Sequence, residues 1–365
     1  MTTTQKKIII VGGGYAGFEI AKGLDGVADV TVVEPREAFV QPPATIRALL
    51  EPALLDQTIL PYGKLLKNGR VVQDRVAQIA ADQVTLESGA VLPADYIVVA
   101  TGSSYAAPFK PAGDSIEAFK AAHAAASTDI MNAKSIAIVG AGAVGSELAG
   151  EIAAAQPDKQ VTLISSEERL FPMYPAKLGA QLAQKLERMG VTIVLGQRAE
   201  TLQRLDAPYA GSVTLSNGQT IAADLVVPVI GSRPNTTLLE ALPGAEITQS
   251  KRVKTDGWMR PSDLPNVFVA GDIADVGDGM TIVAITRQAP WLIKTLKAVV
   301  KGAVVEDQKP YHPWKQAPIL VPLGPHIGNS WLFATVGNWV TRMMKGRDLF
   351  IPKYRKAFGL SGDAK

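Results

Sequence analysis

Short apolar runs that end in glycine or polar residues dominate the hydrophobic pattern of this chain. The first is Ile8-Ile-Ile-Val11, followed by Val30-Thr-Val-Val33 and Tyr96-Ile-Val-Val99. Runs of this kind, rich in β-branched residues, are typical of strands buried in a parallel sheet. The stretch between the first two runs predicts a helix from about Ala16 to Leu24. The pattern therefore predicts an α/β fold.

The same order of elements occurs a second time. Ser135-Ile-Ala-Ile-Val139 repeats the first run, and a helix is expected after it from about Val144 to Ala155. Short alternating strands follow in each copy, near residues 70–93 and 191–222. Two related domains in tandem explain this repetition. A further strand ending at Gly271 and a helix near 281–300 are expected to complete the first domain.

The first copy carries a glycine motif with candidate chemistry. Gly12, Gly14 and Gly17 form a GxGxxG pattern between the first strand and its helix, and Glu34 ends the next strand. Glycine permits a tight turn and close approach of a pyrophosphate, and the helix N-terminus attracts its charge. The acid accepts hydrogen bonds from ribose hydroxyls. This constellation predicts a dinucleotide site.

The second copy repeats the glycine motif as Gly140, Gly142 and Gly145. Its second strand ends in Ser165 rather than in an acid, which leaves no strong bar to a 2′-phosphate. Arg169 lies nearby in the sequence and could meet that phosphate. We therefore expect the second site to accept both NADH and NADPH.

Two dinucleotide sites in one chain indicate one tightly held flavin and one exchangeable nicotinamide. Thr101 and Gly102 end one strand, and Asp272 follows another. Glycine lets a ligand approach the backbone, and the aspartate can accept hydrogen bonds from a sugar-alcohol chain. The alternative interpretation of Asp272 is an N-cap of the helix that follows.

These motifs, with the sequence Lys345-Gly-Arg-Asp-Leu-Phe350 near the end of the chain, carry a family resemblance. The chain resembles the two-dinucleotide-binding-domain flavoproteins of the pyridine nucleotide-disulfide oxidoreductase superfamily. Within them it is most similar to the apoptosis-inducing-factor-like group that includes ferroptosis suppressor protein, whose members reduce quinones with NAD(P)H and FAD.

The resemblance implies an architecture. Residues 1–113 and 253–302 would form a discontinuous FAD-binding domain, with Glu34 on the adenosine ribose and Asp272 on the ribitol. Residues 114–252 would form the NAD(P)H-binding domain, and residues 303–365 a small C-terminal α+β region. The expected fold class is therefore α/β with two tandem Rossmann-type domains.

The resemblance also implies catalytic residues. Glu147 matches an acid near the nicotinamide, and the alternative is a carboxylate favoured by the helix dipole. Lys345 matches a lysine near the flavin ring, and the alternative is a solvated lysine in a basic tail. Arg47 lies in a loop that passes the flavin in relatives, so we expect it to contact the cofactor. The prolines before it would either fix this loop or simply start a helix.

Composition narrows the choice of electron acceptor. The chain has no cysteine, so its own thiols cannot carry electrons to a disulfide or peroxide. A quinone such as ubiquinone is the best remaining acceptor, with oxygen or a redox protein as rivals. A redox-sensing flavoprotein like apoptosis-inducing factor is the alternative function. The three histidines show no metal-ligand spacing, and no metal is expected.

The C-terminal tail bears on partners and location. The net charge of +3 is too small to indicate a nucleic-acid binder, but residues 331–365 hold seven Lys/Arg and only two Asp/Glu. Apolar residues recur there at helical spacing: Leu332, Phe333, Val336, Trp339, Val340, Met343 and Met344. An apolar stripe with a basic flank fits a helix lying on a membrane surface, and the alternatives are a core-covering helix or a homodimer interface. We expect a cytoplasmic protein, peripheral on a membrane if the first interpretation holds.

Overall fold

The computed structural model describes residues 5–360 of the chain, so residues 1–4 and 361–365 of the predicted end domains lie outside it. The chain divides into two compact units. Unit 1 comprises Met1–Phe39, Pro61–Ser104 and Arg233–Ala317, and unit 2 comprises Val40–Leu60, Tyr105–Ser232 and Pro318–Lys365. These limits describe packing, so the predicted cofactor domains with boundaries at 113, 252 and 302 stay a prediction.

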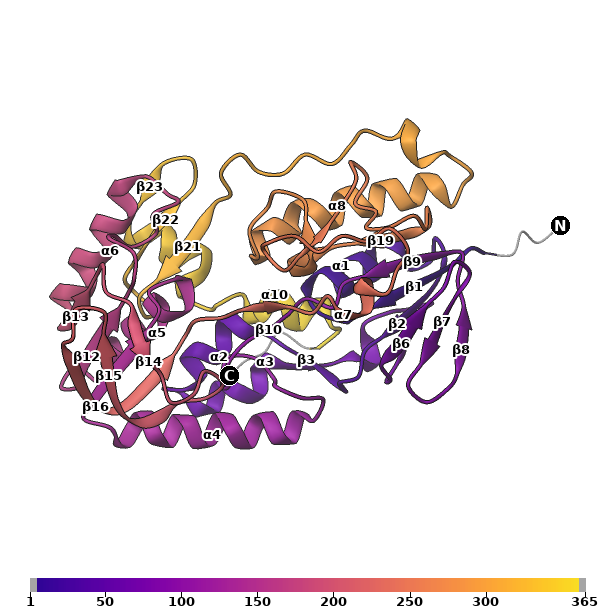
Figure 1. The fold of residues 1–365 in the computed structure, drawn as a ribbon. Helices are drawn as coiled ribbons and strands as arrows, with labels where there is room; N and C mark the ends of the chain where they lie inside the picture. Colours follow the sequence, from indigo (N-terminus) through magenta and orange to yellow (C-terminus); the bar gives the residue numbers. More distant parts are fainter. Residues whose placement is uncertain (1–4, 361–365) are drawn as a thin grey trace. The chain divides into compact units, whose positions relative to one another are not determined.

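Unit 1 is built on a parallel sheet of five strands in the order β19-β9-β1-β2-β5. These strands are β1 (Lys7–Val11), β2 (Asp29–Val33), β5 (Arg70–Val72), β9 (Tyr96–Val99) and β19 (Val267–Val269). Helices α1 (Tyr15–Leu24) and α8 (Ile282–Val299) lie on one face (Figure 1). Both helices begin and end close to where the sequence predicted.

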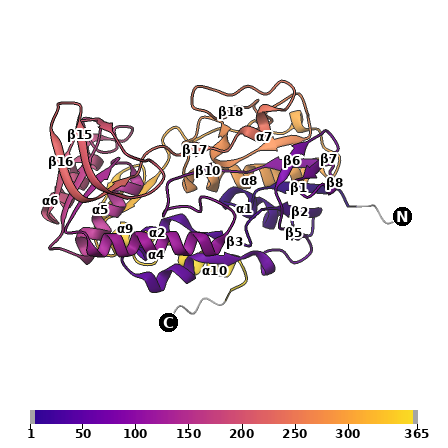
Figure 2. The same cartoon turned by 60° about the horizontal axis from the view of Figure 1, so that its bottom comes forward.

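Alternation along β1 explains how unit 1 fills two cores. Ile8 and Ile10 pack with apolar residues of α1 and α8, whereas Ile9 and Val11 face the opposite side. There they meet an antiparallel three-stranded sheet, shown beside β1 and β2 in Figure 2. Its strands are β6 (Val76–Ile79), β7 (Gln83–Leu86) and β8 (Val91–Pro93). The alternating strands expected within residues 70–93 are thus present.

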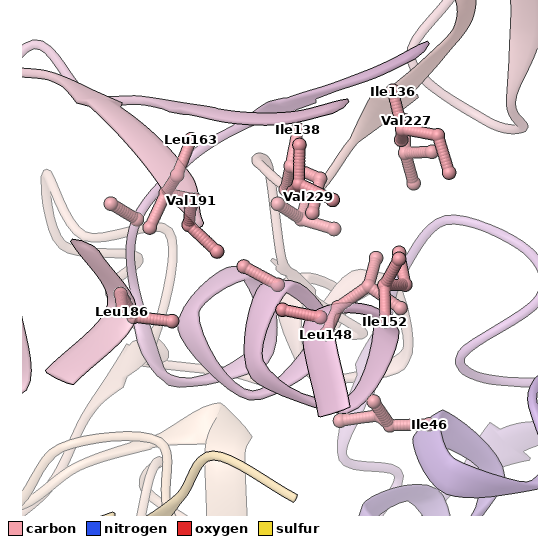
Figure 3. Close-up of a cluster of buried hydrophobic side chains, with 14 of the residues drawn as sticks. Ile46, Ile136, Ile138, Leu148, Ile152, Leu163, Leu186, Val191, Val227 and Val229 are labelled. Carbon is pink, nitrogen blue, oxygen red and sulfur yellow. The ribbon is translucent and has the colours of Figure 1, made fainter. Parts of the chain in front are cut away.

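Unit 2 repeats the plan with a sheet in the order β13-β12-β11-β16-β15-β14. The parallel strands are β11 (Ser135–Val139), β12 (Gln160–Ile164), β13 (Val191–Val194) and β16 (Thr220–Pro228), and the antiparallel ones are β14 (Ala199–Thr201) and β15 (Tyr209–Leu215). Helix α5 (Ala143–Ala155) directs Leu148 and Ile152 toward the strands (Figure 3). The two Rossmann-type sheets confirm the predicted fold class.

Further helices and a small C-terminal sheet complete unit 2. The helices are α2 (Pro42–Ala48), α3 (Leu55–Thr58), α4 (Ile116–Asn132), α6 (Ala176–Arg188), α9 (Asn338–Thr341) and α10 (Ile351–Ala357), and a π-helix spans Arg342–Gly346. The sheet is antiparallel and comprises β21 (Ile319–Pro322), β22 (Gly328–Trp331) and β23 (Thr335–Val336). The C-terminal region is therefore α+β, as expected.

Short elements make up the rest. They are α7 (Thr237–Glu240), β3 (Ala38–Val40), β4 (Ile59–Pro61), β10 (Ser103–Ser104), β17 (Arg233–Pro234), β18 (Val253–Lys254) and β20 (Ala274–Asp275), with 3-10 turns at Pro52–Leu54, Tyr62–Lys64, Gly271–Ile273 and Val305–Asp307. Among residues 5–360, no helix combines the length and apolar character that crossing a membrane would require.

Contrary to what their spacing predicted, the apolar residues of the C-terminal tail do not all lie on one helix. A continuous helix through Leu332, Phe333 and Val336 is wrong, because these residues lie in and beside the β22–β23 hairpin. Hydrogen bonds between β22 and β23 fix the backbone there. Gly337 is extended and is the N-cap of the helix that begins at Asn338. Helical spacing of apolar residues alone could not reveal this turn.

Candidate functional site

The predicted flavin-binding residues gather at one edge of the unit 1 sheet. Gly12, Glu34 and Asp272 follow the carboxyl ends of β1, β2 and β19 within three residues, and Thr101 and Gly102 follow β9. Because these strands are parallel, their carboxyl ends meet at the same edge. In open α/β sheets this edge is where ligands bind.

The first glycine turn has the geometry that a bound phosphate needs. Gly12 has a φ of +101°, and a Cβ placed on it would lie 2.5 Å from the Ala100 carbonyl oxygen. A Cβ on Gly17 would lie 1.9 Å from the Gly12 oxygen, whereas one on Gly14 would meet no atom within 4 Å. Gly12 and Gly17 thus permit close packing, and Gly14, the middle glycine of the motif, leaves open space at the N-terminus of α1.

Glu34 is fixed to this turn. Its Oε2 accepts a hydrogen bond from Gly13 N at 2.8 Å, and its Oε1 accepts one from Arg36 N at 3.2 Å. Tyr62 donates to the Gly13 oxygen at 2.9 Å, and burial together with the nearby Glu34 charge raises the pKa of Tyr62. Arg36 Nη1 also donates to Glu34 Oε1 at 3.2 Å. A carboxylate has about four acceptor sites, so Glu34 keeps capacity for a ribose hydroxyl. These residues fit a dinucleotide.

Asp272 lies in a 3-10 turn at Gly271–Ile273 and accepts a hydrogen bond from Ser103 Oγ at 2.6 Å. The N-cap of α8 is Thr281, whose side chain accepts from Ala284 N. The alternative interpretation of Asp272 as the cap of that helix is therefore wrong. Its carboxylate is instead held at the edge of the sheet where the carboxyl ends of the parallel strands meet.

The Thr101–Gly102 segment is also held in place. Thr101 Oγ1 donates to the Asn235 carbonyl at 2.8 Å, and Asn235 Nδ2 donates back to the Thr101 carbonyl at 2.9 Å. Gly102 has a φ of +65°, and nothing lies within 4 Å of a Cβ placed on it. These two reciprocal hydrogen bonds fix the backbone after β9, and the space next to Gly102 is left open.

Unit 2 reproduces the glycine turn. Gly140 has a φ of +113°, and a Cβ on Gly145 would lie 1.8 Å from the Gly140 oxygen. A Cβ on Gly142 would meet nothing within 4 Å, as at Gly14. These residues fit a second dinucleotide for the same reasons as the first.

The residue after β12 differs from its counterpart in unit 1. Ser165 directly follows β12, in the place that Glu34 has after β2, and its Oγ accepts a hydrogen bond from Glu167 N at 3.1 Å. Arg169 Nη2 donates to the Pro172 carbonyl at 2.7 Å. A contact between Arg169 and a 2′-phosphate stays a prediction.

Glu147 and Lys345, both expected to be catalytic, are brought together in unit 2. Lys345 Nζ lies 2.5 Å from Glu147 Oε1, and only 11% and 5% of the two side chains is exposed. Glu147 comes from α5, two residues after Gly145, and Lys345 from the π-helix. Burial raises the pKa of Glu147, and the Lys345 ammonium partly offsets this. Lys345 is therefore not a solvated tail residue.

A second ion pair lies one helical turn further along α5. Arg47 donates from Nη2 to Glu151 Oε1 at 2.8 Å and from Nε at 3.0 Å, and both side chains are 5% exposed. Arg47 Nη1 also donates to the Arg347 carbonyl at 3.4 Å. Sequence reasoning missed Glu151, although an acid in the mostly apolar helix AVGSELAGEIAAA was a signal. Arg47 lies in helix α2, which begins at the proline pair Pro42-Pro43, so the expected loop is wrong. The predicted cofactor contact of Arg47 stays a prediction.

The comparisons with known proteins agree with this geometry. The family model described as pyridine nucleotide-disulphide oxidoreductase matches residues 6–289. Apoptosis-inducing factor homolog B of Dictyostelium discoideum is 31% identical, over 97% of each chain. Human ferroptosis suppressor protein 1 is 26% identical, over 94% of this chain and 93% of its own.

Solved structures give the same fold. A water-forming NADH oxidase from Lactobacillus brevis, bound to NADH, has a TM-score of 0.61 and 26% identity, covering 85% of this chain and 71% of its own. A NAD-dependent persulfide reductase from A. fulgidus has a TM-score of 0.65 at 23% identity over 82% of this chain, which spans only 60% of the reductase. The chain belongs to the pyridine nucleotide-disulphide oxidoreductase family, whose members use FAD and NAD(P)H, and it is similar to the apoptosis-inducing factor homologs and ferroptosis suppressor proteins within it.

Proposed function

We propose that this protein is an FAD-dependent NAD(P)H:quinone oxidoreductase. In this proposal the discontinuous domain of residues 1–113 and 253–302 holds FAD, and residues 114–252 hold NAD(P)H. The support is the difference between the two glycine turns, since an acid follows the second strand only in the first copy. An acid at that place accepts from a free ribose 2′-hydroxyl, which FAD carries, and its absence from the second copy leaves room for the 2′-phosphate of NADPH.

The bound cofactors would supply the redox chemistry, a hydride from the nicotinamide and two electrons from the flavin to the acceptor. The chain supplies position and charge. The Gly140–Gly145 turn would hold the pyrophosphate of the dinucleotide, and Glu147 would orient its nicotinamide end. Lys345 holds the Glu147 carboxylate in place and provides a buried cation for charge that develops on the acceptor.

The single observation that carries the quinone proposal is the π-helix Arg342–Gly346. It turns Lys345 inward to the buried Glu147 and leaves Met343 and Met344 exposed. An apolar acceptor would thus find exposed apolar side chains next to the buried cation. The lack of cysteine within these 365 residues excludes a route through the chain's own thiols.

The same surface supports peripheral membrane contact. We define the tail patch as Phe333, Trp339, Met343 and Met344, with 67%, 72%, 55% and 42% of the residue exposed. Arg342, Arg347, Lys353 and Lys356 are exposed near these residues in the sequence. Exposed aromatic and apolar groups with a basic flank suit an anionic lipid surface, from which a long-tailed quinone would enter. A homodimer interface is the alternative use of this patch.

Steady-state turnover tests the proposed function. Anaerobic oxidation of NADH and of NADPH would be followed with a short-chain ubiquinone as the acceptor, and with none. We expect rapid oxidation only with the quinone. Oxidation that appears only after air is admitted would favour an oxidase or redox-sensing role, and failure of both nucleotides to react would contradict the assignment of unit 2.

A further inference from the structure

The turn after β19 is held by three side chains of unit 1. Gln288 on α8 accepts a hydrogen bond from Gly271 N through Oε1 at 2.8 Å. Ser103 Oγ donates to Asp272 Oδ2 at 2.6 Å, and Arg252 Nε donates to the Asp272 carbonyl at 3.1 Å. The backbone and the carboxylate of this turn are therefore both fixed by groups distant in sequence.

Gln288 is fully buried, and both ends of its amide are engaged. While Oε1 accepts from Gly271, Nε2 donates to Asp278 Oδ2 at 3.2 Å. Asp278 is 4% exposed and also accepts from the Tyr311 hydroxyl and from Trp314 N. A carboxylate only accepts, so Asp278 forces the NH₂ end of the amide toward itself. The amide oxygen must then face Gly271.

The backbone at Gly271 explains why this acceptor matters. Gly271 has a φ of +82°, and a Cβ placed on it would lie 3.2 Å from the Cβ of Ala16 at the start of α1. The residue is buried, so its N–H requires an acceptor inside the protein. Without the Gln288 oxygen, the Ala270–Gly271 peptide, which leads into Asp272, would lose the bond that fixes its orientation.

We propose that Gln288 is a positioning residue for flavin binding, and that Asp278 orients its amide. Gln288 holds the Gly271–Asp272 turn in the conformation in which the Asp272 carboxylate accepts hydrogen bonds from the ribitol hydroxyls. This inference rests on the proposed binding of FAD by unit 1. It adds a relay from Asp278 through Gln288 to the turn, which the family motifs do not include.

The rate of FAD release from the purified holoprotein tests the relay, with the visible circular dichroism of the bound flavin as a second readout. Gln288→Met keeps the approximate shape and removes both hydrogen bonds. We expect FAD release to become on the order of tenfold faster, with an altered dichroism spectrum. Thr295→Val is the matched control, because Thr295 is buried on the same helix two turns away; its release rate should stay that of the wild type.

A double variant tests the mechanism of orientation. Gln288→Glu places a second carboxylate against Asp278 and should release FAD faster still. Adding Asp278→Asn lets the amide NH₂ at position 278 donate to one oxygen of the glutamate at position 288. The other oxygen of that glutamate can then accept from Gly271 N, so FAD release should return toward the wild-type rate. Rescue of this kind would not occur if Gln288 merely filled space.

Several outcomes would overturn the relay. One is wild-type release and dichroism in Gln288→Met, and another is equally fast release from Thr295→Val. If Gln288→Met does not fold, Gln288→Glu takes its place, and a rate of FAD release that added Asp278→Asn does not restore toward the wild-type rate would contradict the relay. A wild-type protein that binds no FAD would instead overturn the proposed function itself.

Discussion

The Glu147 carboxylate is buried beside the Lys345 ammonium, so neither charge can be removed alone without leaving the other uncompensated. We expect Lys345→Met to lower the free energy of unfolding by about 3–5 kcal/mol. Adding Glu147→Leu should restore most of that loss, because a well-packed apolar pair of similar volume replaces the ion pair. Urea unfolding measures both effects.

Activity should behave differently from stability in these variants. If the pair is catalytic, the stable double variant remains slow in NADH-driven reduction of the flavin, followed by the loss of its visible absorbance. A double variant that recovers both stability and the wild-type rate would show that the pair is only structural. Glu147→Gln removes the negative charge but keeps an acceptor for Lys345, so it should lose less stability than a variant without any acceptor and still react slowly.

The Lys345→Met variant also predicts a pH dependence. Burial already raises the pKa of Glu147, and loss of the ammonium that lowers it would raise it further. An acid whose pKa is higher in the folded state favours folding only while it is protonated. The stability deficit of Lys345→Met relative to wild type should therefore be small below the ordinary glutamate pKa of about 4.3. It should grow as the pH rises from there through the pKa of Glu147 in the folded protein. A deficit that shrinks toward pH 8 would contradict this.

Ser165 is expected to set the nucleotide preference. The wild type should use NADH and NADPH with values of kcat/KM that differ by less than about a hundredfold. Ser165→Glu would place a carboxylate where the 2′-phosphate would lie and should reduce kcat/KM for NADPH by about tenfold or more, while leaving NADH in use. Ser166→Glu, at the exposed neighbouring position, is the control. If both variants reduced kcat/KM for NADPH equally, Ser165 would not be the residue that sets the nucleotide preference.

At the scale of elements, the sequence predicted the helices and strands that a local pattern of residues specifies. Helix α1 follows the first glycine turn and α5 the second, because the repeated strand–glycine–helix pattern specifies both locally. The C-terminal region did not follow this rule, since Leu332 and Val336 owe their conformation to pairing between strands rather than to spacing. The Arg47–Glu151 pair joins residues 104 apart, and no local pattern could reveal it.

That ion pair yields a prediction for α2 and α5. Arg47 anchors α2 to α5 and reaches the Arg347 carbonyl, so Glu151→Leu alone should destabilise the protein by about 3–5 kcal/mol. The double variant Glu151→Leu with Arg47→Met should be near wild-type stability and should retain its FAD. Loss of FAD from a stable double variant would instead support the direct cofactor contact predicted for Arg47.

At the scale of the whole molecule, the tail patch predicts lipid binding. Trp339→Glu with Met343→Glu should abolish flotation with vesicles that contain anionic lipid, because two carboxylates oppose both burial and the surface charge. Val91→Glu is a control at a similarly exposed apolar residue elsewhere. Unchanged flotation of the double variant, or no flotation of the wild type, would contradict lipid binding by the tail patch. A homodimer interface would then be the remaining use of this patch.

The central claim is that electrons pass from NAD(P)H through FAD to a quinone on this one chain. The most direct test is anaerobic mixing of the holoprotein with one equivalent of NADH, followed by a short-chain ubiquinone, while the flavin absorbance is recorded. We predict rapid bleaching and then rapid recovery when the quinone is added. Bleaching without recovery would contradict the quinone as acceptor, and no bleaching with NADH or NADPH would contradict the nucleotide site of unit 2.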